Sequence, residues 1–244
     1  MTDLKDNGSQ YYDNDDFFRK YTLKRESKDN ANDTIEKPIF QELVGNVSGL
    51  YILDLGCGDG KYGVKLLQAG SAGYLGLEGS NNMYNLAVKN LEIFEHGNVV
   101  HSTLEDYDFP ESRYDLVVSR LVLHYIENID TLFEKIYCSL KDGGRFIFSI
   151  EHSVITSTLQ TVGQRTGWLV DQYFSEGIRD QIWLDPQVYK YHRTIETYFL
   201  ALQNVGFNIE KLRESKPLRQ HFKNADIYER RLTIPWFLFM AGKK

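Results

Sequence analysis

Cysteine is scarce in this sequence. Cys57 and Cys138 are the only two cysteines among the 244 residues. Two distant cysteines cannot form the disulfide framework of a small secreted domain, so we expect a reducing, cytoplasmic environment. A zinc site needs several clustered cysteine or histidine ligands, and no pair of histidines here has ligand spacing. The sequence therefore predicts no metal site.

Long apolar runs and an excess of positive charge are also missing. No run approaches the roughly 20 apolar residues that a membrane-spanning helix needs. The opening residues MTDLKDNGSQ lack the basic start and the apolar segment of a secretory signal. With 34 acidic against 28 basic residues, the net charge of −6 argues against a protein that binds nucleic acid through its phosphates. We therefore expect no membrane or nucleic-acid partner, and the sequence indicates no particular oligomeric state.

What the sequence does have is a regular alternation between residues 46 and 151. Short apolar segments alternate there with helical patterns of roughly 10 to 15 residues, which is typical of βαβ units. The expected strands are 51–55, 73–78, 98–102, 114–120 and 144–151, and the expected helices are 61–70, 80–94 and 128–141. This pattern predicts an α/β fold with a doubly wound, mainly parallel, Rossmann-like sheet.

The N-terminal flank and a later insertion complete an expected single domain, residues 1–244. Residues 1–45 hold two helical patterns, the second running from Pro38 to about Val44, so we expect an N-terminal helical cap over the core of 46–151. Residues 152–190 show no clear period, which is typical of a lid or substrate-binding insertion. Its aromatic residues are Trp168, Tyr173, Phe174, Trp183 and Tyr189.

The C-terminal part, residues 191–244, predicts a helix followed by a strand pair. The helix is expected over 191–206, where Gly206 ends it. The strands are expected over 207–215 and 231–242, with one C-terminal strand antiparallel. Pro235 lacks an amide donor, so we expect it at a bulge or on an unpaired side of the last strand.

A glycine turn interrupts the first strand pattern. The segment YILDLGCGDGKYG places Gly56, Gly58 and Gly60 where a strand would need packing side chains. In an open parallel sheet, ligands bind beyond the carboxyl ends of the strands, where this turn lies. A dinucleotide site needs a third glycine at the position of Lys61, and Asp54 would repel a pyrophosphate.

A cationic cofactor fits these residues better. S-adenosylmethionine has a sulfonium, an ammonium and a ribose diol. Asp54 can hold the ammonium, and Glu78 at the end of the second strand can accept both ribose hydroxyls. The turn leaves the backbone of Gly56, Cys57 and Gly58 open to close approach. The residues therefore indicate S-adenosylmethionine as cofactor.

Four motifs in register carry a family resemblance. LDLGCGDGKYG, YLGLEGSNNM, LEDYDFPESRYDLVVSRLVLHYIEN and LKDGGRFIFSIEH resemble the class I S-adenosylmethionine-dependent methyltransferases. The match covers about residues 50–151, and the final strand pair extends it to the C-terminus. The chain is most similar to a branch of small bacterial methyltransferases with an EKP segment before the glycine turn and a YHRT segment after the sheet.

The resemblance implies further cofactor contacts. Met83 would pack on the adenine, and the segment with Leu104 and Glu105 would follow its edge, although Thr103 replaces a frequent aspartate. An N-terminal helix would fold over the cofactor, with Arg25 near its carboxylate. The full expected set is Tyr21, Arg25, Asp54, Gly56, Cys57, Gly58, Glu78, Gly79, Met83, Leu104, Glu105, Ser119, Arg120 and His124.

Methyl transfer is an in-line displacement that needs alignment, and a general base only when the acceptor is a hydroxyl or a protonated amine. Glu151 and His152 end the fifth strand, and His192 follows the insertion. A histidine with a pKa near 6.5 suits proton removal at neutral pH, so we expect His152 or His192 to be the base. The alternative is that one histidine caps a helix and the other shapes the pocket.

The aromatic insertion predicts a small organic acceptor that is methylated on oxygen or nitrogen. Three alternatives stay open: a methyltransferase acting on a tRNA wobble uridine, a protein that binds the cofactor without catalysis, and a nucleotide-dependent oxidoreductase. The acceptor itself cannot be named from the sequence.

Overall fold

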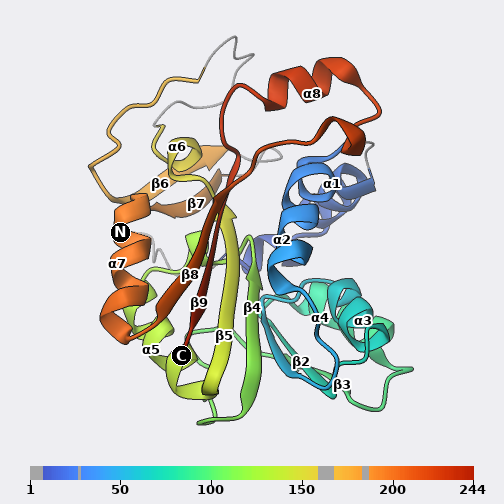
Figure 1. Cartoon of the computed structure of the whole chain (residues 1–244). Helices are drawn as coiled ribbons and strands as arrows, with labels where there is room; N and C mark the ends of the chain where they lie inside the picture. Colours follow the sequence, from blue (N-terminus) through green and yellow to red (C-terminus); the bar gives the residue numbers. More distant parts are fainter. Residues whose placement is uncertain (1–7, 27–28, 159–167, 183–186) are drawn as a thin grey trace.

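The structure is a computed structural model that describes residues 8–26, 29–158, 168–182 and 187–244 (Figure 1). Its centre is a seven-stranded sheet with the strand order β3-β2-β1-β4-β5-β9-β8. The strands are β1 (Tyr51–Leu55), β2 (Gly73–Glu78), β3 (Gly97–His101), β4 (Tyr114–Arg120), β5 (Leu140–Glu151), β8 (Asn208–Glu214) and β9 (Phe237–Lys243). Strands β1 to β5 are parallel, and β9 is antiparallel to both neighbours. The predicted mainly parallel Rossmann-like sheet with a C-terminal antiparallel strand is confirmed.

Helices cover both faces of this sheet (Figure 1). They are α1 (Asp15–Glu26), α2 (Lys37–Val44), α3 (Lys61–Gln68), α4 (Asn81–Leu91), α5 (Ile129–Ser139), α6 (Ser153–Thr156), α7 (Ile195–Val205) and α8 (Ala225–Arg231). Short helical turns are η1 (Gln10–Asp13), η2 (Asn32–Glu36), η3 (Leu123–Tyr125) and η4 (Arg219–His221). Side chains of a strand alternate between the faces, so Ile52 packs with α2, α3 and α4 while Leu53 packs with α5 and α7.

The order of the strands creates a site suited to a ligand beyond the carboxyl ends of β1 and β4, which we call the crevice. From β1 the chain runs outward to β2 and β3, and then returns to β4 on the other side of β1. Ligands bind at such a reversal, beyond the carboxyl ends of the strands. Here β1 ends at Leu55 and β4 ends at Arg120. The glycine turn therefore lies in the crevice, as expected.

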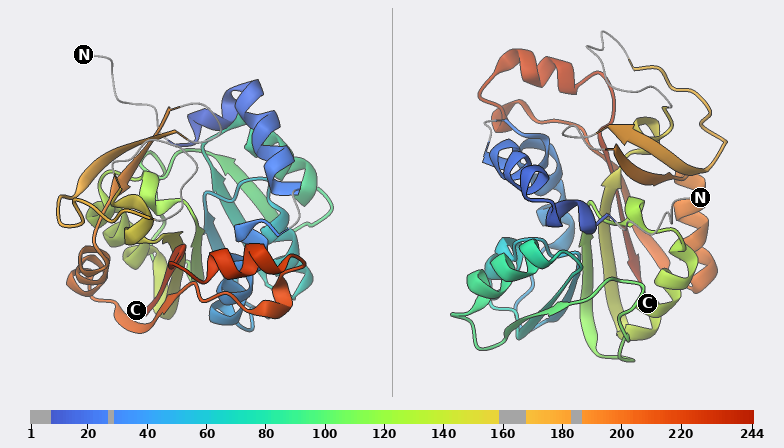
Figure 2. Two further views of the ribbon diagram at one scale, coloured as in Figure 1. Left: turned by 90° about the horizontal axis from the view of Figure 1, so that it is seen from above. Right: turned by 180° about the vertical axis from the view of Figure 1, so that it is seen from behind.

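The same end of the sheet is covered by segments that are far apart in the sequence. The two views of Figure 2 show α1, α8 and the two-stranded sheet of β6 (Gly177–Ile182) and β7 (Gln187–His192) gathered at this end. The backbone N–H of Tyr189 in β7 donates to the hydroxyl of Tyr11 in η1 at 3.1 Å. The N-terminal segment and the insertion therefore meet over the crevice.

The insertion is more regular than its sequence pattern indicates. It contains α6 and the antiparallel β6–β7 pair, while Trp183 lies outside the described residues. Strand β7 runs through His192, so the helix expected over 191–206 begins later, at Ile195. The side chain of Thr194 sets this start because its hydroxyl accepts a hydrogen bond from the N–H of Thr197. Gly206 ends the helix in the left-handed conformation, as predicted.

The last predicted strand is also shorter than expected. Residues 225–231 form α8, whose start is capped by the Asn224 side chain accepting from the N–H groups of Asp226 and Ile227. Strand β9 begins at Phe237, so Pro235 precedes the strand and no bulge is needed. The prediction that Pro235 lies within the strand is therefore wrong, because residues 225–231 form α8 and the connection to β9 follows it.

Candidate active site

The glycine turn brings bare backbone to the crevice. Gly56 and Gly58 have φ of +69° and +58°, a region that L side chains rarely adopt. A Cβ on Gly56 would lie 2.5 Å from Cγ2 of Val122, so glycine is required there by packing as well. A Cβ on Gly58 would meet no atom within 4 Å. The turn is therefore packed at Gly56 and open at Gly58, where a ligand can lie against the backbone.

Glu78 joins this turn to the next strand. Its Oε2 accepts from the N–H of Gly58 and its Oε1 from the N–H of Ser80, both at 2.8 Å. Burial raises the pKa of Glu78, and the backbone hydrogen bonds from Ser80, Gly58 and Gly79 oppose this shift. Each carboxylate oxygen keeps a further lone pair for a ligand hydroxyl. Ser80 also caps α4, because its Oγ accepts from the N–H of Met83.

Asp54 is buried at the end of β1. Its side chain is 2% exposed, and its Oδ2 accepts from the hydroxyl of Tyr74 at 2.8 Å. Burial raises the pKa of Asp54 to about 6, while the Tyr74 hydroxyl and the Arg120 guanidinium oppose that rise. A cationic group bound here would favour the ionised carboxylate. Cys57 follows in the turn, and burial raises the pKa of its thiol, so it is a small packed residue in this structure.

The N-terminal segment lies directly on the turn after β2. Oδ1 of Asp13 accepts from the Ser80 hydroxyl at 2.8 Å and from the N–H of Asn82 at 3.0 Å. A Cβ on Gly79 would come within 2.7 Å of the Ser9 hydroxyl, so the segment packs closely there. Tyr12 is a neighbour of both Glu78 and Glu151, and burial raises its pKa. Tyr12 therefore lies between the two ends of the crevice.

Helix α1 brings Tyr21 and Arg25 to the same crevice. The Tyr21 ring stands edge-on to the Tyr12 ring, with 4.9 Å between centroids. Burial raises the pKa of Tyr21, and the guanidinium groups of Arg25 and Arg120 oppose this rise. Arg25 donates to Oδ1 of Asn30 at 2.9 Å and lies 3.7 Å from Oδ1 of Asp33. The structure thus brings Tyr21 of α1 near both Arg25 and Arg120, the last residue of β4.

Ser119 and Arg120 end β4 beside the glycine turn. The Ser119 hydroxyl is buried and donates to the carbonyl of Leu55 at 3.3 Å. Arg120 forms an ion pair with Glu36, a residue that is 0% exposed and that the sequence analysis had not assigned to the site. The EKP segment was the available signal for Glu36, although it gave no partner.

The residues expected at the adenine edge lie after β2 and β3. Met83 and Leu104 are both 5% exposed. Thr103 donates to Oδ2 of Asp106 at 2.8 Å, so an acid is present one turn away from the position of the missing aspartate. The Glu105 side chain is exposed, and its carbonyl accepts from Nζ of Lys135 at 2.8 Å.

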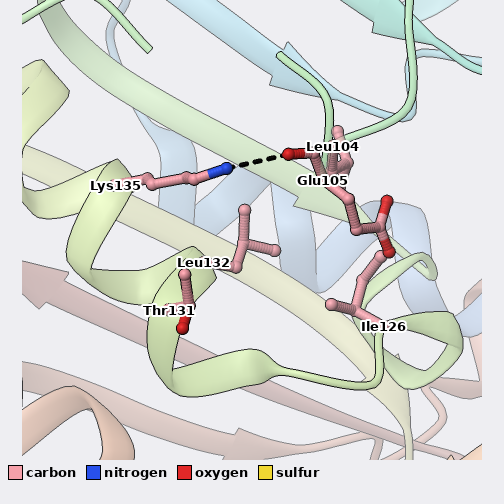
Figure 3. A pocket seen from close by; sticks show the side chains of 6 residues that line it. All are labelled: Leu104, Glu105, Ile126, Thr131, Leu132 and Lys135. Atoms are coloured by element: carbon pink, nitrogen blue, oxygen red, sulfur yellow. Dashed lines mark hydrogen bonds between the residues drawn. The ribbon is translucent and has the colours of Figure 1, made fainter. Parts of the chain in front are cut away.

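A small pocket lies on the α5 side of this segment (Figure 3). Its volume is about 120 Å³, and its lining residues are Leu104, Glu105, Ile126, Thr131, Leu132 and Lys135. Pockets that take a cofactor or drug-sized ligand measure roughly 300 to 1,000 Å³. This pocket is therefore too small for an adenosyl group and is separate from the glycine turn.

Glu151 and His124 form the other end of the crevice. Oε1 of Glu151 pairs with Nζ of Lys190 at 2.7 Å, while its buried Oε2 has no hydrogen-bond partner in the described part of the chain. Burial would raise the pKa of Glu151, but Lys190, His124 and Lys24 outweigh it and the pKa is lowered. Nδ1 of His124 accepts from the N–H of Glu151 at 3.4 Å, and burial lowers the pKa of His124 to about 3.

The two expected histidine bases have both ring nitrogens engaged. Nδ1 of His152 accepts from the N–H of Val154 and so caps α6, which leaves Nε2 to donate to Glu214 at 3.0 Å. Nε2 of His192 donates to the carbonyl of Tyr173, and Nδ1 accepts from the hydroxyl of Thr156, both at 2.8 Å. Burial lowers the pKa of both rings. In this geometry the two histidines hold the insertion together.

Among the described residues, no group of three histidine, cysteine or acidic side chains could hold a metal ion. None of the helices within the described ranges is long and apolar enough to cross a membrane.

Comparison with known proteins adds four findings. A family model for a methyltransferase domain matches residues 53–148. An uncharacterised protein of Haemophilus influenzae is 32% identical over 96% of both chains. The structure of an S-adenosylmethionine-dependent methyltransferase from Mesorhizobium loti is 32% identical, with a TM-score of 0.79 over 86% of this chain and 97% of that one. Phosphoethanolamine N-methyltransferase 2 of Haemonchus contortus, solved with S-adenosylmethionine, shares the fold alone: 16% identity and a TM-score of 0.67 over 97% of this chain and 59% of that one.

Proposed function

This chain belongs to the class I S-adenosylmethionine-dependent methyltransferases, and we propose that it methylates an oxygen or nitrogen of a small organic acceptor. The observation that carries the proposal is the pair of buried carboxylates at the ends of β1 and β2, Asp54 and Glu78, with the open backbone of Gly58 bonded to Glu78. When bound, S-adenosylmethionine supplies an electrophilic methyl group on its sulfonium. The acceptor's lone pair forms the new bond to the methyl carbon, and the carbon–sulfur electron pair leaves with sulfur.

The residues of the crevice fit this cofactor. Asp54 is a buried acid, and the cationic ammonium would stabilise the ionised carboxylate that burial disfavours. Glu78 is fixed by two backbone N–H donors and can accept a ribose diol with its remaining lone pairs. A pyrophosphate in the same place would face the two buried carboxylates, Asp54 and Glu78. The donor set therefore favours a sulfonium cofactor over a dinucleotide.

In this proposal the remaining expected residues enclose the cofactor. Met83 and Leu104 supply apolar contacts for the adenine, and Tyr21 and Arg25 of α1 cover the amino-acid end. Residues 8–45 act as a cap, and the part of the insertion that contains β6 and β7 acts as a lid. The contact between Tyr11 and Tyr189, which joins the two, supports this arrangement.

Glu151 is the proposed acceptor contact. Its Oε2 is buried and unpaired at the end of β5, and Lys190 holds the side chain in place through Oε1. Because its pKa is lowered, Glu151 orients an acceptor hydroxyl or ammonium by hydrogen bonding rather than by holding a proton. His152 and His192 then act indirectly, because they hold in place the insertion that carries Lys190.

Isothermal titration calorimetry tests the cofactor site. The wild-type protein should bind S-adenosylhomocysteine and not NADH, and Asp54→Ala and Glu78→Ala should each lose binding. Asp142→Ala is the matched control, because Asp142 is an exposed acid of the same sheet, near the start of β5. Binding of NADH, or equal binding by all three variants, would contradict the assignment.

Catalysis needs a second measurement. A screen of amines, phenols and carboxylic acids with the radiolabelled cofactor should show methyl transfer that Glu151→Gln reduces about 10-fold or more at saturating cofactor. Transfer to no acceptor by a protein that binds the cofactor tightly would instead favour a non-catalytic binding protein.

A further inference from the structure

The EKP segment, Glu36–Pro38, places a carboxylate under the end of β4. Glu36 closes η2, and its side chain is 0% exposed. Its Oε1 accepts from Nε of Arg120 at 3.1 Å, and its Oε2 accepts from Nη2 of the same guanidinium. The Ser149 hydroxyl donates to Oε1 at 2.8 Å. One edge of the guanidinium is therefore held by a bidentate, fully buried carboxylate.

Two aromatic rings fix the plane of the same guanidinium. Cζ of Arg120 lies 4.7 Å from the centroid of the Tyr62 ring and 5.4 Å from that of Phe40. Cationic guanidinium groups are attracted to the faces of such rings. Phe40 belongs to α2, which begins within the EKP segment, and Tyr62 belongs to α3, which follows the glycine turn. With its edge and its plane both held, the guanidinium of Arg120 has one orientation.

The remaining edge of the Arg120 guanidinium is partly open. Nη1 has no hydrogen bond to the described residues, and the Arg120 side chain is 22% exposed while Glu36 is fully buried. Asp54 and Tyr21 are close enough for the Arg120 charge to act on their pKa values. In the proposed function, Asp54 and Tyr21 lie around the amino-acid end of the cofactor. Arg120 follows Ser119, which pairs with Leu55 of β1, so Arg120 lies at the same end of these two strands as Asp54 and the glycine turn.

The amino-acid end of S-adenosylmethionine carries an ammonium and a carboxylate. Asp54 is suited to the ammonium, and Arg25, which the resemblance places near the carboxylate, is paired with Asn30 and Asp33 in this structure. We infer that Glu36 is a positioning residue that holds Arg120 so that its Nη1 edge receives the cofactor carboxylate. This inference rests on the proposed cofactor contacts, and it gives the EKP segment a role in reading the amino-acid end of the cofactor.

A pair of ligands separates this role from a merely structural one. S-adenosylhomocysteine contains the amino-acid group, whereas 5′-methylthioadenosine keeps the adenine, ribose and thioether but lacks that group. Calorimetry would measure both ligands with the wild type, Glu36→Gln and Arg120→Lys. Glu36→Gln keeps the shape of the side chain but loses the charge that orients Arg120, and Arg120→Lys keeps a charge but loses the fork.

Both variants should lose about 10-fold in affinity for S-adenosylhomocysteine. Their affinity for 5′-methylthioadenosine should stay within about twofold of wild type, since the adenosine contacts are untouched. An equal loss for both ligands, or no loss for either, would overturn the inference.

The wild type distinguishes this failure from failure of the proposed function. If it binds neither ligand, the cofactor assignment itself fails. If it binds both equally well, the cofactor site stands but the amino-acid group is not read, and the role of Glu36 is refuted. Arg120→Lys keeps the test informative if Glu36→Gln does not fold, because part of the Arg120 side chain is exposed.

Discussion

The carboxylate of Glu78 accepts a hydrogen bond from the backbone N–H of Gly58, at 2.8 Å and across 20 positions of sequence. This bond ties the glycine turn after β1 to the end of β2. The bare surface of the turn and the acid that can accept a diol are therefore parts of one rigid unit. A ligand seated on Gly58 must also meet Glu78, which explains why both features belong to one site.

Gly58→Ala should weaken S-adenosylhomocysteine binding by about 10-fold or more, because the new methyl group would enter the space that the ligand uses. The left-handed backbone would also cost about 1 to 2 kcal/mol of stability. Gly49→Ala is a matched control, since Gly49 has φ +77° and nothing within 4 Å of its Cβ position, but lies in the turn before β1. The two variants should show similar unfolding midpoints in urea and different affinities in calorimetry. Equal affinities would place the ligand elsewhere.

The pH dependence of binding should report on Asp54. Its pKa is raised to about 6 in the folded protein, mainly by burial, against 3.8 for the free side chain. A raised pKa means that stability from this group is present below pH 3.8 and is lost as pH rises through about 6. Binding of a cationic ammonium runs the other way, because it needs the ionised form.

The affinity for S-adenosylhomocysteine should therefore rise about 10-fold from about pH 5 to about pH 7. Asp54→Asn should bind weakly and with a flatter pH profile. Tyr74→Phe removes the hydrogen bond that lowers the Asp54 pKa, so its profile should move to higher pH. Glu78 also has a raised pKa, and Glu78→Gln shows which part of the profile it contributes. An unchanged profile in Asp54→Asn would remove Asp54 from ammonium binding.

The sheet and its glycine turn could be predicted because their signals are local. Each strand and helix from Tyr51 to Glu151 has its own apolar period, and Gly56 and Gly58 mark the turn within one short segment. Helix α8 was missed because residues 225–230 lie in the connection between the two expected C-terminal strands, where the cap formed by the Asn224 side chain is only a weak local signal. Strand β7 was missed because its pairing with β6, rather than its own period, stabilises it.

The pairings between residues of the site could not be predicted from the sequence. Glu36 and Arg120 are 84 positions apart, and no period or spacing in one sequence relates a helical segment to a distant strand end. The same holds for His192, which bonds Thr156 across 36 positions. A histidine that titrates near neutrality and a buried histidine with two partners look alike in sequence, since burial alone separates their pKa values.

His192→Ala should destabilise the fold without weakening cofactor binding. His192 is fully buried, and its loss leaves the Tyr173 carbonyl and the Thr156 hydroxyl unpaired, at a cost of about 3 kcal/mol. Urea unfolding measures this cost, and calorimetry should show an affinity for S-adenosylhomocysteine within about twofold of wild type. His96→Ala is the control, because the side chain of His96 is exposed. A His192→Ala variant of wild-type stability that binds the cofactor but no longer methylates an acceptor would restore the role of general base.

Asp13→Ala should accelerate release of the bound product. Asp13 fastens η1 to α4 through the Ser80 hydroxyl and the Asn82 N–H, and Ser9 of the same segment packs against Gly79. Loss of these two hydrogen bonds should raise the dissociation rate of S-adenosylhomocysteine about threefold to tenfold, measured by displacement in a stopped-flow instrument. Asp16→Ala is matched to it, since Asp16 lies in the next turn and pairs with the exposed Arg19. If the segment becomes more sensitive to protease in Asp13→Ala while release keeps its wild-type rate, η1 covers the site without controlling exit.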